Sequence, residues 1–180
     1  MAHGIVRTDN MFGTDVRAGL VSIKYIVTTG AGTEQSPYVD TETEIDNGNV
    51  LLVGPLMSGE REIFKGSAVA ADSPISDVVL VCSPEIMYDE RKYALDQFFN
   101  EAGKPARGYR LHSGDIFSVT KDALAGAATP AVGDIVELAA GTKMSVVAAG
   151  TGATSGSTVV GSIIAIDVVG PYTYYAILVD

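Results

Sequence analysis

The chain is 180 residues long, which suits one domain of ordinary size, and 47% of its residues are hydrophobic against 19% charged. That balance supplies enough apolar surface for a packed core and excludes a disordered tail. The formal net charge of −10 repels phosphate backbones and anionic membrane surfaces, so neither nucleic acid nor a membrane is an expected partner.

Residues 1–19 are rich in turn-forming residues and contain few apolar ones. The isolated apolar anchors are Ile5, Val6, Met11, Phe12 and Val16. This pattern predicts an extended N-terminal arm that lies on a neighbouring subunit, with an end that simply frays as the open alternative. If the arm binds a neighbour, these five anchors are the candidate partner-binding residues. Deleting residues 1–19 would then leave the domain folded and weaken its attachment.

Short runs of β-branched and aromatic residues follow one another along most of the chain, separated by Gly, Pro, Ser and Asp. The clearest are residues 20–27, 62–69, 77–82, 107–112, 115–120, 135–138, 144–148, 159–169 and 172–179. Within residues 43–52, Asn47-Gly48 separates two further runs and predicts a hairpin with a two-residue turn. Because helical segments do not alternate with these runs, we predict a mainly β fold, an antiparallel β-barrel or sandwich.

One segment, at about residues 88–100, has helical spacing. Four apolar or aromatic residues fall near one face: Tyr88, Leu95, Phe98 and Phe99. Acidic residues come early, and a glycine and a proline follow the end. This predicts one short helix whose aromatic stripe packs on the core, with a ligand groove as the alternative.

The composition changes after this segment, from charged to small and β-branched residues. We therefore divide the chain into the arm 1–19, a β-rich region 20–105 with the helix, and a C-terminal barrel-like region 106–180. The last two regions could also form one domain.

No residue set points to catalysis or to a transition metal. Cys82 lies inside a β-branched run and is expected to be a buried, inert thiol. The residues of His112–Asp115 include the types used in a triad, but Gly114-Asp115 is better explained as a turn. We predict no enzyme activity, no catalytic or metal-ligating residues and no cofactor. Calcium stays open, because carboxylates alternate along one segment at Asp40, Glu42, Glu44 and Asp46.

The sequence also lacks the apolar stretches used for membrane insertion and export. No window approaches the ~20 apolar residues of a membrane span, and the first residues lack the apolar block of a secretory signal. We expect the protein to be made and kept in a soluble compartment.

Three strings in the C-terminal part resemble those of head decoration, or cement, proteins of tailed bacteriophages, which contain small β-barrel domains. They are GDIFSVT at residues 114–120, VGDIVEL at 132–138 and VGSIIAIDVVGPYTYYAILV at 160–179. The resemblance covers about residues 105–180. It rests on the residue pattern of the β-strands and not on invariant functional residues.

The resemblance implies a structural protein of a phage virion. Such a protein would be made in the host cytoplasm and bind the outer surface of the head, where it stabilises contacts between major capsid subunits. Its partners would be the major capsid protein and itself, in an oligomer that is often a trimer. Two other hypotheses stay open: a tail, collar or fibre component that acts as a receptor- or carbohydrate-binding module, and a hydrolase whose activity would depend on His112 or Asp115.

Overall fold

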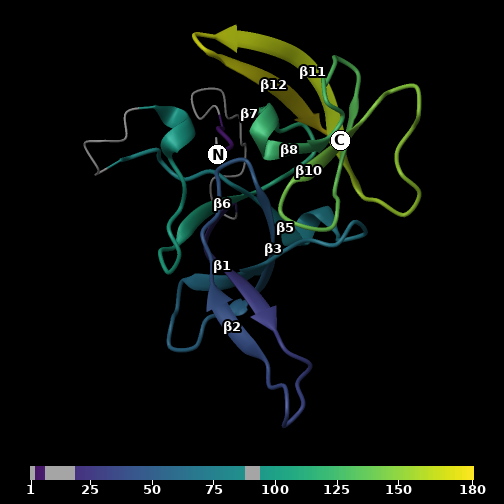
Figure 1. The fold of residues 1–180 in the computed structure, drawn as a ribbon. Helices are drawn as coiled ribbons and strands as arrows, with labels where there is room; N and C mark the ends of the chain where they lie inside the picture. Colours follow the sequence, from purple (N-terminus) through teal and green to yellow (C-terminus); the bar gives the residue numbers. More distant parts are fainter. Residues whose placement is uncertain (1–2, 7–18, 88–93) are drawn as a thin grey trace.

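The computed structural model describes residues 3–6, 19–87 and 94–180. The predicted mainly β fold is confirmed, with 48% of the residues in strands and 6% in helical turns. The strands form two sheets, a closed five-stranded barrel and a curled, open half-barrel (Figure 1).

The barrel is formed by strands from the first part of the chain. Its strands, in order around the barrel, are β1 (Leu20–Thr29), β4 (Ile63–Ser67), β3 (Val50–Leu56), β5 (Val78–Val81) and β6 (Ala106–Arg110). Antiparallel pairing of β6 with β1 closes it. One neighbouring pair, β1 and β4, is parallel. β2 (Val39–Glu42) pairs with the outer end of β1, so the β1–β2 hairpin extends beyond the barrel (Figure 1).

The second sheet is formed by the remaining strands. Its strands are β7 (Ile116–Thr120), β12 (Tyr172–Val179), β11 (Val159–Val169), β9 (Ile135–Glu137), β10 (Met144–Val147) and β8 (Leu124–Gly126), in that order across the sheet. Here β8 and β10 are parallel and the other neighbours are antiparallel. The strands β11 and β12 form a hairpin that projects from the sheet (Figure 1).

β5 joins the two sheets into one packed unit, because all its side chains are buried. Successive side chains of a strand point to opposite faces. Val79 and Val81 therefore pack inside the barrel, whereas Val78 and Leu80 pack in the cluster between the barrel and the half-barrel. That second cluster also contains Phe117, Ile163 and Ile177. β6 is the last strand of the barrel, and the second sheet begins with β7.

The start of the chain belongs to this shared core. Ile5 and Val6 are 2% and 1% exposed, and Val6 pairs with Val119 of β7 as an isolated bridge. The Thr120 N–H donates to the Ile5 carbonyl oxygen at 2.9 Å, and the Ile5 N–H donates to Thr120 Oγ1 at 3.1 Å. Both side chains are thus buried within the chain itself, which stabilises the fold. That Ile5 and Val6 contact a partner stays a prediction. Met11, Phe12 and Val16 lie outside the described residues.

The predicted helix at 88–100 is wrong for the part that the structure describes. Residues 88–93 lie outside the described residues, and beyond them there is one 3₁₀ turn at Leu95–Gln97 with extended backbone on both sides. The reason is a strand-like bridge between Asn100 and Ile45, whose backbone N–H groups donate to each other's carbonyls at 2.8 and 3.0 Å. No helix in the described parts of the chain is long and apolar enough to span a membrane.

The predicted hairpin at Asn47-Gly48 is also wrong. The expected two-residue turn needs a positive φ at both Asn47 and Gly48. Gly48 has a φ of +84°, but no non-glycine residue in the described part has a positive φ, so Asn47 does not adopt the required backbone conformation. The Asn49 N–H donates to the Asp46 carbonyl at 3.4 Å, and β3 pairs with β4 and β5 instead of with the run before the turn.

Candidate functional site

The cysteine is not placed to act as a nucleophile. Cys82 is 2% exposed, next to the end of β5. Burial raises the pKa of its thiol to about 12, and the nearby Glu85 carboxylate adds to the increase. Since the thiolate is the reactive form, the thiol is inert near neutral pH, as expected from its sequence context.

The segment His112–Asp115 forms a tight turn between β6 and β7. The Asp115 carboxylate accepts the His112 backbone N–H at 2.9 Å, whereas the His112 ring nitrogen lies 3.7 Å away, beyond hydrogen-bond distance. The same turn recurs before β9, where Asp134 accepts the Ala131 N–H at 2.8 Å. The repetition of one turn at two strand starts assigns these aspartates to turn formation.

The alternating acids expected at a possible calcium site lie along β2 and the residues after it. Asp40 bonds Lys65 Nζ at 2.7 Å, and this contact with Lys65 lowers the pKa of the carboxyl. Glu42 pairs with Lys24 at 3.0 Å, and Asp46 with His3 at 2.7 Å. Within residues 3–6, 19–87 and 94–180, no group of three His, Cys, Asp or Glu side chains gathers as a metal site requires.

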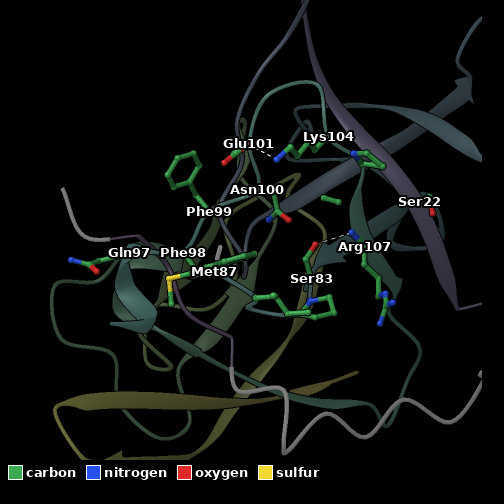
Figure 2. Close-up of a pocket in the computed structure, with 14 residues that line it drawn as sticks. Ser22, Ser83, Met87, Gln97, Phe98, Phe99, Asn100, Glu101, Lys104 and Arg107 are labelled. Atoms are coloured by element: carbon green, nitrogen blue, oxygen red, sulfur yellow. Dashed lines mark hydrogen bonds and ion pairs between the residues drawn. The ribbon is translucent and has the colours of Figure 1, made fainter. Parts of the chain in front are cut away.

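A pocket of about 460 Å³ lies at one end of the barrel (Figure 2). Its walls come from β1, from residues 83–87 after β5 and from residues 97–107. Apolar lining comes from Met87, Phe98 and Phe99, and polar lining from Asn100 and Arg107. The acidic residue in the lining, Glu101, forms an ion pair with Lys104 at 2.6 Å. The lining is typical of a site that binds a ligand by contact and hydrogen bonds.

A buried amide network joins Asn47 to two residues of the pocket lining, Ser83 and Asn100. The fully buried Asn47 donates to the Ser83 carbonyl at 2.9 Å, and its side-chain oxygen accepts the Ser83 N–H at 2.9 Å. Asn100 Nδ2 donates to the same oxygen at 3.1 Å. Burial raises the pKa of the neighbouring Glu85, and a hydrogen bond with Asn47 partly opposes that shift. The network therefore ties the turn at Asn47 to the chain that leaves β5.

The second candidate site is the exposed face of the projecting β11–β12 hairpin (Figure 1). Ile164 lies at the bulge between Ile163 and Ala165, and Ile166 and Val168 follow at alternate positions of β11. These three residues are 41%, 41% and 74% exposed. Val169, at the end of the strand and on its other face, is 47% exposed. We call these four residues the β11 stripe. Contiguous exposed apolar residues on a projecting element are typical of surfaces that contact another protein.

The predicted partner-binding residues and the β11 stripe do not coincide. The sequence did identify β11 with its observed bounds, but the prediction placed the binding surface in the N-terminal arm instead. The sequence could not have shown the stripe, because its exposure depends on which strand lies beside β11 in the fold. β11 is 11 residues long and its neighbour β9 only 3, and β9 pairs with β11 only as far as Ser162.

Comparison of this chain with protein-family models, with curated proteins and with solved structures found no match.

Proposed function

We propose that this chain is a structural protein of a phage virion, which binds the outer surface of the capsid and stabilises contacts between major capsid subunits. The observation that carries the proposal is the β11 stripe, an apolar surface on a hairpin that projects away from the core. The resemblance of residues 114–120, 132–138 and 160–179 to phage decoration proteins supplies the identity of the proposed partner.

The energetics favour a partner on this hairpin. Complete burial of a valine or isoleucine side chain stabilises by about 1.5–3 kcal/mol. Val168 is 74% exposed, so most of that free energy is still to be gained on contact with a second protein. Association costs at least about 4 kcal/mol of lost freedom, so contacts at several residues of the stripe are needed to offset it.

The net charge of the chain favours a position on the outer surface of the capsid. A net charge of −10 repels packaged nucleic acid, and a protein that lies on the outer surface of the head avoids that repulsion. In this proposal the protein is made in the host cytoplasm, contacts the major capsid protein and other copies of itself, and performs no catalysis. It needs neither a cofactor nor a membrane.

A second function is favoured by the pocket. A cavity of about 460 Å³ with Phe98, Phe99 and Asn100 on its walls could hold a small ligand such as a sugar. The chain would then be a tail, collar or fibre component that acts as a receptor- or carbohydrate-binding module.

The number of copies per virion separates these two functions. We predict that quantitative mass spectrometry of purified virions from the phage that encodes this chain will find on the order of hundreds of copies, because a symmetric shell repeats each binding site. The major capsid protein in the same sample provides the internal standard. A few copies per particle would favour the tail or fibre component, and absence from the particle would contradict both.

A further inference from the structure

The pocket at the end of the barrel contains a buried amide with an acceptor atom that is left for a ligand. Asn100 lines the pocket and is 8% exposed. Its Nδ2 donates to the Ile45 carbonyl at 3.0 Å and to Asn47 Oδ1 at 3.1 Å. Because a carbonyl oxygen only accepts, these bonds fix the orientation of the amide. The Asn100 Oδ1 has no hydrogen-bond partner among the described residues, and such buried atoms are normally satisfied by water or a ligand.

Ser83 lies beside Asn100 on the pocket wall. The Ser83 N–H donates at 2.9 Å to the same Asn47 Oδ1 that Asn100 bonds, and Figure 2 shows both residues in the lining. The Ser83 Oγ accepts the Arg107 backbone N–H at 2.9 Å, and no described residue accepts its hydroxyl hydrogen. An acceptor on Asn100 and a donor on Ser83 together match a ligand hydroxyl, which can donate to one and accept from the other.

The described wall of the pocket also includes a cation without an acidic partner. Its charged residues are Glu101, Lys104 and Arg107. Glu101 and Lys104 form an ion pair at 2.6 Å, whereas the guanidinium of the exposed Arg107 makes no hydrogen bond or ion pair with a described residue. Glu85 is not part of the lining, and its carboxylate bonds Asn47. A guanidinium binds a carboxylate through two parallel hydrogen bonds, so Arg107 favours a ligand with a carboxylate.

We infer that this pocket binds an acidic sugar, a sugar ring with hydroxyl groups and one carboxylate. A ring hydroxyl bonds Asn100 Oδ1 and the Ser83 hydroxyl, the carboxylate pairs with Arg107, and Met87 and Phe98 contact the C–H groups of the ring. The cavity of about 460 Å³ has the size of a small-molecule site. The inference rests on the second proposed function, binding of a small ligand in the pocket. It adds the class of that ligand and the residue that selects it.

The net charge of the whole chain does not prevent this binding. A charge of −10 repels an anion at long range, but at about 0.15 M salt the charges that lie more than about 8 Å away are largely screened. The carboxylate then responds mainly to the charges of the pocket itself. The test is therefore made at this ionic strength.

The test follows the backbone amide signals of the full chain by NMR during titration with single sugars. The acidic probes are glucuronic acid and galacturonic acid. Their neutral counterparts, glucose and galactose, have the same ring hydroxyls and a CH₂OH group in place of the carboxylate. We predict that at least one acid shifts the signals of Ser83, Asn100 and Arg107, and that its neutral counterpart binds at least about tenfold more weakly.

Two variants and one small anion serve as controls. Arg107→Gln removes the charge at an exposed position and should weaken binding of the acid at least about tenfold, to the level of its neutral counterpart. Arg61→Gln removes an equal charge at an exposed residue outside the pocket lining and should bind the acid as the wild type does. Acetate, which has a carboxylate without ring hydroxyls, should bind more weakly than the acidic sugar.

The possible outcomes separate this inference from the function on which it rests. Equal binding of acidic and neutral sugars, or unchanged binding by R107Q, would overturn the acidic ligand but leave a sugar site in the pocket. Binding of acetate as tight as that of the acidic sugar would overturn the role of the ring hydroxyls. If no sugar shifted the signals of Ser83 and Asn100, the second proposed function would be contradicted as well. Because no phage heads are present, attachment to the capsid is judged by its own measurement.

Discussion

Replacing both Ile5 and Val6 by alanine is expected to lower the free energy of unfolding by about 4–7 kcal/mol. Truncation of a fully buried Ile costs about 2–5 kcal/mol, and a buried Val somewhat less. Since Ile5 and Val6 are 2% and 1% exposed and pack beside β7, both costs should apply. A loss of this size is comparable with the whole stability of many domains. Urea denaturation followed by circular dichroism would measure it.

A matched control for this variant is Val132→Ala. Val132 is 61% exposed, so its truncation should change the stability by less than about 0.5 kcal/mol. Removal of residues 1–6 should be as damaging as the double alanine variant, which reverses the expectation that residues 1–19 can be deleted without loss of the fold. If the double variant unfolded at the same urea concentration as the wild type, the packing of this segment on β7 would be incorrect.

Asn47→Ala should cost about 3–5 kcal/mol of stability. The side chain is fully buried and bonds both backbone groups of Ser83 and the amide of Asn100. Its removal loses these hydrogen bonds and leaves buried polar groups without partners, at about 1–3 kcal/mol for each unsatisfied group. The measurement is again the midpoint of urea unfolding, with the slope of the transition as a check on two-state behaviour.

Asn49→Ala is the matched control for this variant. Asn49 is 5% exposed, but among the described residues its amide makes one long bond, to Thr142 at 3.4 Å, and its side-chain oxygen has no partner there. Truncation of Asn49 should therefore cost about 1 kcal/mol or less. Equal losses of stability for the two variants would show that the hydrogen bonds of Asn47 do not stabilise the fold as argued.

The strands could be predicted from the sequence wherever they carry a continuous run of β-branched or aromatic residues. Residues 159–169 and 172–179 were predicted with the bounds that β11 and β12 have. The sequence did not reveal β2, because all four of its side chains are exposed and it has no apolar alternation. The short β8 was missed as well, since three residues give too little pattern to be distinguished from a loop.

Local signals failed where distant contacts decided the backbone. Asn47-Gly48 favours a two-residue hairpin by itself, but Asn47 instead bonds Ser83, which lies 36 residues further along the chain. Leu95 and Phe98 have helical spacing, yet the bridge between Ile45 and Asn100 holds the following chain extended. Such pairings depend on the complete fold, and a local pattern contains no information about them.

The candidate site was the least predictable part. Isolated apolar residues such as Ile5 and Val6 give the same sequence signal whether they bind a partner or complete the core. The β11 stripe gives the signal of a buried strand, and its exposure follows from the short length of β9. Burial is a property of the assembled sheets and cannot be assigned to one strand at a time.

The central claim is that this chain attaches to a capsid through the β11–β12 hairpin, and the most direct test is cosedimentation with emptied phage heads. We predict that the double variant I166K/V168K binds at least about tenfold more weakly than the wild type, because the charges prevent burial of the stripe, at about 1.4 kcal/mol for each tenfold change. The control V132K, at a position that is also exposed, should bind normally. Equal binding of the hairpin variant and the wild type, or no binding by the wild type, would contradict the claim.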